Sequence, residues 1–186
     1  MNQALLVIDA QQQLMDGNQE EKEVFQKKRL IEHINRVINQ ALEAGASIIF
    51  VRDKDVANGQ GPGFQVHNEI NIPTSTAIFI DKEATNAFYK TELLQYLKEQ
   101  QITHLVIMGC KTEHCIDTAV RTATVHAFDV TLVGDGHSTT DSKVLSAEKI
   151  IAHHNDLLHG HYNVDNFSVV RNAHEHLFEP NHDQYR

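Results

Sequence analysis

The chain alternates between short apolar runs and longer segments in which apolar positions recur every three or four residues. The runs do not alternate with polar residues, which is typical of strands covered by helices on both faces of a parallel sheet. Six runs predict strands, at residues 4–8, 47–51, 76–80, 104–108, 130–133 and 167–170. The periodic segments predict helices at residues 22–44, from residue 91, at 113–127 and at 142–158. Strands and helices in alternation favour a three-layer α/β/α sandwich with a mainly parallel, six-stranded sheet.

The length of the chain favours one domain. Its 186 residues, of which 41% are hydrophobic, suffice for one complete core but are few for two. We therefore expect a single domain over residues 1–186. Within it, residues 52–75 show no periodicity and are interrupted by three glycines and two prolines. A connection of this length usually serves a function in a compact domain, so we expect a pocket wall or a lid.

Composition and charge narrow the choice of partner. The net charge of -9 argues against a nucleic-acid surface, which usually shows a clustered basic excess. No window approaches the roughly 20 apolar residues that a membrane helix needs. The N-terminus resembles no secretory signal, and Cys110 and Cys115 lie too close together to staple a secreted fold. We expect a cytoplasmic protein that binds a small molecule and neither nucleic acid nor membrane.

Cys115 is the first candidate for chemistry. It follows the strand at 104–108 and the turn at Gly109, and it falls within the first turn of the next predicted helix. Unpaired N–H groups and the positive end of the helix dipole would stabilise a thiolate there and lower the pKa of the thiol. The alternative is that Cys115 is a small buried hydrophobic residue, as free cysteines commonly are.

Two more polar residues stand just past predicted strands, Asp9 directly after the first and Lys82 two residues after the third. The carboxyl ends of parallel strands meet at one edge of the sheet, where ligands bind. A carboxylate there can take the proton of a thiol, and a lysine can hold both groups in their charged forms. Taken singly, Asp9 is explained as well by a helix cap and Lys82 by a solvated charge. Together with Cys115 they indicate an acyl-transfer site, in which no other acidic residue is expected to replace Asp9.

Three segments, residues 6–11, 81–93 and 109–119, resemble in this order the isochorismatase-like cysteine hydrolases, a group that includes the nicotinamidases. The resemblance extends from about residue 4 to about residue 170. It implies an isochorismatase-like hydrolase domain with a Rossmann-like sheet in the strand order 3-2-1-4-5-6. It also implies a catalytic triad, an oxyanion hole, a cis peptide bond and assembly as a homodimer or larger homo-oligomer. The triad falls on Asp9, Lys82 and Cys115, the oxyanion hole on the backbone N–H groups of Lys111 and Cys115, and the cis bond between Cys110 and Lys111.

Departures from the family pattern narrow the chemistry that the resemblance implies. Nicotinamidases bind a divalent metal with an Asp-x-His pair and a further histidine, whereas the matching stretch here reads Asp53-Lys54-Asp55, with His67 as the remaining candidate ligand. A lysine inside the site would repel a cation, so we expect no metal and no cofactor. Isochorismatases that act on a vinyl ether lack the cysteine. We therefore expect a cysteine-dependent hydrolase of a small-molecule, non-peptide amide, working through a thioester.

Several interpretations remain open beside this one. The enzyme can instead be of the nicotinamidase or isochorismatase type. A catalytically silent, flavodoxin-like binding protein would keep the scaffold without a reactive thiol, and a redox sensor would join Cys110 to Cys115. For the amidase we expect four apolar pocket walls, although ordinary core packing explains the same residues. These are Leu14, Phe64, Phe88 and Tyr89.

Overall fold

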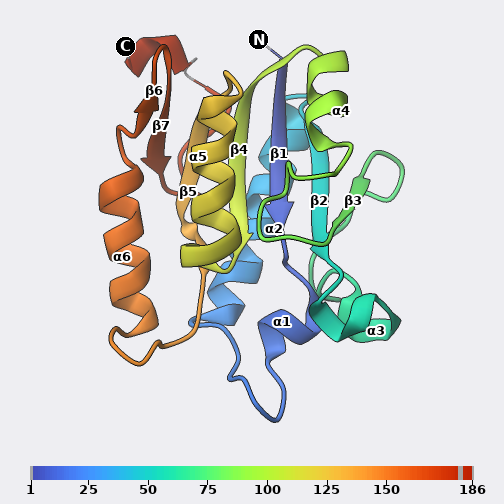
Figure 1. Ribbon diagram of the computed structural model, residues 1–186. Coiled ribbons are helices and arrows are strands. Elements are labelled where there is room, and N and C mark those ends of the chain that lie inside the picture. Colours follow the sequence, from blue (N-terminus) through green and yellow to red (C-terminus); the bar gives the residue numbers. More distant parts are fainter. Residues whose placement is uncertain (1, 180–181, 186) are drawn as a thin grey trace.

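The computed structural model describes residues 2–179 and 182–185, and a seven-stranded sheet lies at its centre (Figure 1). The strands are β1 Asn2–Ile8, β2 Ser47–Asp53, β3 Ile78–Lys82, β4 Ile102–Cys110, β5 Asp129–Ser138, β6 Tyr162–Asn163 and β7 Asn166–Arg171. Their order is β3-β2-β1-β4-β5-β7-β6, and all neighbours pair in parallel except β6 with β7. The predicted α/β class and the order of the six main strands are confirmed. The additional strand β6 has two residues, too few to carry a periodic signal.

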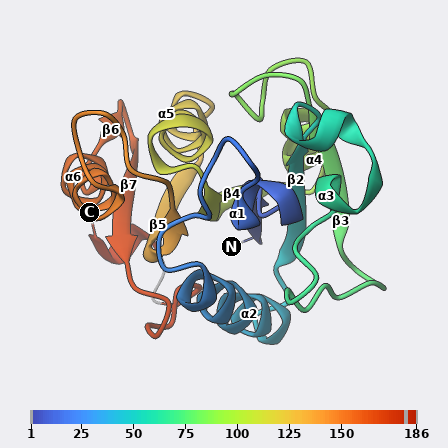
Figure 2. The same cartoon turned by 90° about the horizontal axis from the view of Figure 1, so that it is seen from below.

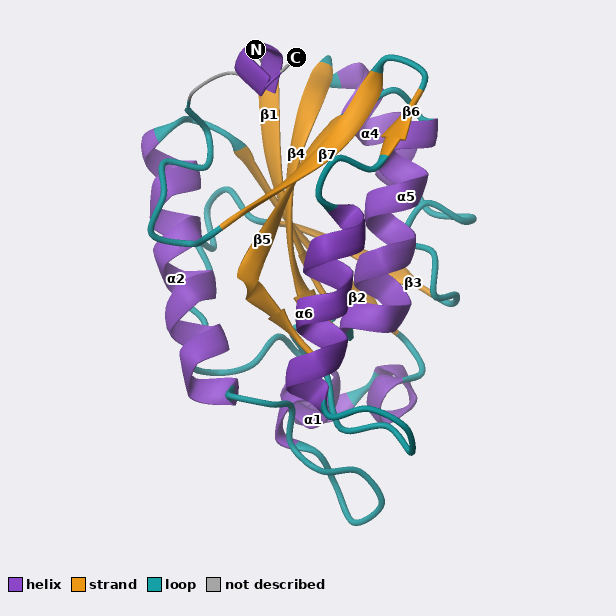
Figure 3. Ribbon diagram, turned by 90° about the vertical axis from the view of Figure 1, so that its left-hand side faces the viewer, coloured by secondary structure: helices purple, strands orange, loops and turns teal. Residues whose placement is uncertain are grey.

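Helices cover both faces of the sheet. They are α1 Gln12–Asp16, α2 Lys27–Glu43, α3 Gly61–Phe64, α4 Leu93–Glu99, α5 Asp117–Val125 and α6 Ala147–Leu158. Helix α2 lies on one face, and α4, α5 and α6 lie on the other (Figure 2). Figure 3 shows the twisted sheet between α2 and the α5–α6 layer. Among the described helices, none combines the length and the apolar composition that crossing a membrane would need.

Strand β1 is apolar from Ala4 to Ile8 because this part contributes to both hydrophobic layers. Leu6 and Ile8 pack in the layer beneath α4 and α5. Leu5 and Val7 point the other way and pack in the layer that contains Ile34 of α2. All four strand residues are buried. Double burial removes the usual alternation of polar and apolar residues, which is why the pattern predicted a central parallel strand.

Several predicted boundaries are wrong. The helices expected from residues 22 and 142 begin five residues later, at Lys27 and Ala147. Residues 134–138 were expected in a loop, but they extend β5 to Ser138. The pairing is irregular there, since Ile107 lies opposite Leu132 whereas Gly109 lies opposite His137. The helix expected from residue 113 begins instead as a π-helical turn, Thr112–Ile116, which leads into α5. The irregular region after β2 contains a short 3₁₀ turn, Val56–Gly59, before α3.

Gly109 is the position at which β4 leaves no room for a side chain. Its φ of +126° is unfavourable for residues with a Cβ, and an added Cβ would lie 1.9 Å from the carbonyl oxygen of Ile8 in β1. We expect Gly109→Ala to lower the free energy of unfolding by at least about 3 kcal/mol, because the backbone must move. Urea denaturation followed by circular dichroism measures this loss.

Gly160 provides the matched control. Its φ is also positive, at +82°, but an added Cβ would have no atom within 4 Å. Gly160→Ala therefore tests the conformational cost alone, about 1 kcal/mol. Equal losses for the two variants would contradict the close approach of β1 and β4 at Gly109.

Candidate active site

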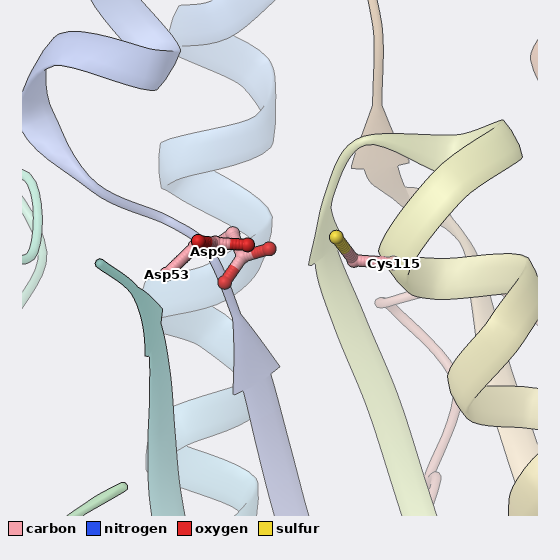
Figure 4. Close-up of side chains that lie close together, drawn as sticks. All are labelled: Asp9, Asp53 and Cys115. Atoms are coloured by element: carbon pink, nitrogen blue, oxygen red, sulfur yellow. The ribbon is translucent and has the colours of Figure 1, made fainter. Parts of the chain in front are cut away.

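Four chemically reactive side chains meet at the carboxyl ends of the central strands. Asp9 directly follows β1, Asp53 ends β2 and Lys82 ends β3. Cys115 lies in the π-helical turn after β4. Figure 4 shows Asp9 and Asp53 side by side on neighbouring strands, with the sulfur of Cys115 pointing toward them. The structure thus brings together the three residues that the sequence selected and adds Asp53.

The ammonium group of Lys82 lies at the centre of this cluster. Its Nζ is 3.0 Å from Oδ2 of Asp9 and 3.4 Å from Sγ of Cys115, and it also donates a hydrogen bond to Oδ2 of Asp53. The lysine side chain has no exposed surface. A buried cation requires such partners, because an unpaired charge is costly to remove from water.

The register of the sheet and one glutamine position the cluster. Strands β2 and β3 pair in parallel with Asp53 opposite Lys82, so the two side chains are neighbours. The buried amide of Gln11 accepts a hydrogen bond from the N–H of Asp53 at 2.8 Å and donates to its carbonyl oxygen at 3.0 Å. The N–H of Asp9 donates to the carbonyl oxygen of Val51 at 2.8 Å, which holds the end of β1 against β2.

Burial and mutual charge set the protonation states. Burial raises the pKa of Asp9 to about 6, and the positive charge of Lys82 limits the rise. For Lys82, burial lowers the pKa, but the negative charges of Asp9 and Asp53 outweigh it and hold the pKa above its ordinary value. Burial and then the carboxylate of Asp9 raise the pKa of Cys115. The expected lowering of this pKa at a helix start is therefore wrong, because burial and a nearby negative charge dominate.

A cavity of about 430 Å³ opens beside the cluster. Its lining includes the four groups Asp9, Asp53, Lys111 and Cys115, so the nucleophile candidate and the predicted oxyanion-hole residues face the same space. The remaining lining residues are Gln13, Leu14, Asn18, Glu21, Asp55, Val56, Thr85 and His114. Residues 55 and 56 belong to the irregular connection, which was expected to form a pocket wall. The peptide bond between Cys110 and Lys111 is cis, as the family resemblance implied.

Of the four expected apolar walls, only Leu14 lines this cavity. Phe64 is buried, with its ring beneath the guanidinium of Arg52 at 4.5 Å from the centroid. Phe88 packs into the core beneath the α4–α5 layer, and Tyr89 is exposed. The prediction of Phe64, Phe88 and Tyr89 as walls of this cavity is wrong because their side chains turn toward the core or the solvent.

Sequence reasoning missed the acidic character of the site. Asp53 was considered only as a metal ligand, and no second carboxylate was expected next to Asp9. A carboxylate oxygen of Asp53 nevertheless lies within 4.8 Å of a carboxylate oxygen of Asp9 and of Sγ of Cys115. The strand-end rule that selected Asp9 applies equally to Asp53. Glu21 and Asp55 lie in irregular segments that gave no signal of this kind.

The residues do not fit a nicotinamidase-type metal site. The side chain of Asp53 is bound to Lys82. Both ring nitrogens of His67 are engaged, Nε2 with Asp16 at 3.1 Å and Nδ1 with the N–H of Glu69 at 3.2 Å. Asp9, Asp53 and Cys115 have the spacing of cation ligands, but the ammonium of Lys82 contacts all three. Lys54, which was expected to repel a cation from inside the site, instead pairs with Glu83 outside the cavity lining.

Cys110 is separated from Cys115 by the sheet. Its side chain is buried in the layer beneath α2, whereas Cys115 contributes to the opposite layer. Both cysteines are free, and burial raises the pKa of Cys110. A disulfide between them would require the turn that joins them to rearrange, which disfavours the redox-sensor interpretation.

Comparison with known proteins gives consistent matches. The family model described as the isochorismatase domain matches residues 3–150. An uncharacterized isochorismatase family protein of Bacillus subtilis, YrdC, is 28% identical over 137 residues, which cover 71% of each chain. A crystal structure of an isochorismatase family protein is 29% identical, covers 91% of this chain and 98% of its own, and has a TM-score of 0.81. The pyrazinamidase of Pyrococcus horikoshii, solved in complex with zinc, is 21% identical with a TM-score of 0.72, covering 92% and 99% of the two chains.

The charge of Asp9 gives a direct prediction for the thiol. Because this carboxylate raises the pKa of Cys115, Asp9→Asn is expected to lower that pKa and to speed alkylation by iodoacetamide at pH 7.5, by about tenfold per pKa unit. Mass spectrometry locates the modified cysteine. Asp156→Asn, the same change of charge at an exposed position of helix α6 outside the cavity lining, is the control. Slower alkylation in Asp9→Asn than in the wild type would contradict the assigned electrostatics.

Proposed function

The chain belongs to the isochorismatase family of hydrolases, and from this premise we propose that it cleaves the C–N bond of a small, non-peptide amide with Cys115 as nucleophile. One observation carries the proposal. The sulfur of Cys115 lies 3.4 Å from a buried ammonium and within 4.8 Å of a buried carboxylate, at the wall of a cavity of about 430 Å³. A thiol with an adjacent base and a space for an acyl group is the arrangement of a covalent hydrolase.

In the first half-reaction, Asp9 takes the proton of Cys115 while the sulfur attacks the carbonyl carbon. The carbonyl oxygen becomes an oxyanion, to which the backbone N–H groups of Lys111 and Cys115 donate hydrogen bonds. The C–N bond then breaks, and the proton held by Asp9 passes to the leaving nitrogen. Ammonia or an amine departs, and a thioester remains on Cys115.

In the second half-reaction, water attacks the thioester and transfers a proton to Asp9. The tetrahedral intermediate collapses, the sulfur leaves, and the proton returns to Cys115. The net change is the hydrolysis of an amide to a carboxylic acid and an amine. A base with a pKa of about 6 is ionised at neutral pH yet basic enough to accept a proton in the transition state.

Lys82 and Asp53 support this chemistry without exchanging protons. The raised pKa of Lys82 keeps the ammonium charged throughout, so it stabilises both the carboxylate of Asp9 and the negative charge that develops on sulfur. Asp53 binds the same ammonium and holds it at the end of β3. Asp53 is thus a positioning residue in this scheme.

The site favours an amide over the alternatives. Cleavage of a vinyl ether needs no nucleophilic cysteine, whereas acyl transfer through a covalent intermediate can use one. A nicotinamidase of the metal type needs ligands that Asp53 and His67 do not offer here, because their side chains bind Lys82 and Asp16. The pyrazinamidase with the same fold is named for an amide substrate, which agrees with the reaction type proposed for this chain.

A panel of small primary amides tests the proposal through the release of ammonia. Cys115→Ala is expected to lower kcat/KM by at least about 10³-fold, because it removes the group that forms the thioester. Acid quenching during turnover, followed by mass spectrometry, is expected to show the acyl mass on Cys115 in the wild type alone. Circular dichroism verifies that the variant is folded. Full activity in a purified, folded Cys115→Ala sample would remove the nucleophile assignment.

A further inference from the structure

The cavity beside Cys115 holds more negative than positive charge. Four carboxylates line it, those of Asp9, Glu21, Asp53 and Asp55. Two ammonium groups oppose them. Lys111 pairs with Glu21 at 2.9 Å, and Lys82 is shared between Asp9 and Asp53. With all four carboxylates ionised, the balance is two negative charges in excess.

Asp55 contributes one of these charges and is available to a ligand. Its backbone N–H donates to Oδ1 of Asp53 at 2.9 Å, which places it next to the catalytic cluster. Its exposed carboxylate forms no ion pair or side-chain hydrogen bond with any residue that the structure describes. Lys54, the adjacent cation, is engaged by Glu83 at 2.8 Å.

The deep end of the cavity has the same negative character. Asp9 is completely buried and lines the cavity, and beyond Lys82 and Cys115 its carboxylate has no side-chain partner among the described residues. The cavity therefore has a carboxylate at its deep end, that of Asp9, and another at its rim, that of Asp55. The ammonium of Lys111, which also lines the cavity, is already paired with Glu21.

We infer that the substrate is a small cationic amide, carrying an ammonium or guanidinium group, and that Asp55 binds this cation. The inference rests on the proposed amidase function and adds its substrate class. The two uncompensated negative charges attract a cationic substrate into the cavity and repel one that carries a carboxylate. Attraction and repulsion are both strong there, because the charges are close together and partly shielded from water. An acidic amide of the same size is the substrate that this cavity excludes.

Charged thiol reagents measure this selectivity without any substrate. Aminoethyl methanethiosulfonate is cationic and sulfonatoethyl methanethiosulfonate is anionic. Each transfers its thioalkyl group to a thiol, forming a mixed disulfide and releasing methanesulfinate. Their rates with Cys115 at pH 8 are divided by their rates with 2-mercaptoethanol, so that intrinsic reactivity cancels. We expect the corrected rate of the cationic reagent to be at least about tenfold the anionic rate. Mass spectrometry identifies the modified residue, with Cys115→Ala as the blank.

Two variants test whether the cation preference comes from Asp55. Asp55→Asn is expected to reduce the cation preference about threefold, since it removes one charge from the rim. Asp156→Asn makes the same change of net charge on helix α6, outside the cavity lining, and is expected to leave the preference unchanged. If the corrected rates of the cationic and anionic reagents are equal in the wild type, the inference is overturned. If the ratio of these rates is the same in Asp55→Asn as in the wild type, the role of Asp55 is overturned.

The amide panel separates this inference from the proposed function. Matched cationic, neutral and anionic amides of one acyl size are compared by kcat/KM. Hydrolysis that favours the cationic member, with KM for that member raised in Asp55→Asn, supports both proposals. Hydrolysis of the anionic member at an equal or higher rate overturns the substrate class and leaves the amidase intact. A cation preference of the thiol reagents together with no hydrolysis of any amide overturns the amidase alone.

Discussion

The buried ammonium of Lys82 is the interaction on which the site depends. Its side chain has no exposed surface, so its charge is stable in the interior only with partners close by. The strand order supplies them. Because β3, β2 and β1 are neighbours and run in parallel, their carboxyl ends bring Lys82, Asp53 and Asp9 into contact. Strand β4, on the other side of β1, then delivers Cys115 to the same point.

The same arrangement sets the basicity of Asp9, the proposed general base. Burial alone would push the pKa of Asp9 upward and make it a neutral acid, and the charge of Lys82 holds the value to about 6. Cys115 stays protonated at neutral pH because burial and the charge of Asp9 raise its pKa. In the proposed mechanism, the nucleophile is therefore generated by proton transfer from Cys115 to Asp9 at the moment of attack. A thiol kept in this state is also less open to oxidation than a resting thiolate.

The fold and the cluster could be predicted from the sequence because both follow from local pattern. Unbroken apolar runs marked the central strands, and polar residues directly after them marked the edge that carries Asp9 and Lys82. The failures concern properties that depend on distant parts of the chain. The direction of Phe88 is decided by core packing, and the pKa of Cys115 by burial and by Asp9, a residue far away in sequence. The extension of β5 to Ser138 was not predicted because Gly134 and Gly136, residues of a type that usually marks loops, lie inside an irregular strand.

In the proposed mechanism, Asp9 is a buried base whose charge is maintained by Lys82. Titration of the side-chain carboxyl of Asp9 by ¹³C NMR, with Asp9→Asn used to assign the signal, measures its pKa. We expect a midpoint near 6, well above the ordinary aspartate value of about 3.9. A midpoint at or below the ordinary value would mean that ion pairing outweighs burial and that Asp9 is too weak a base for the role described.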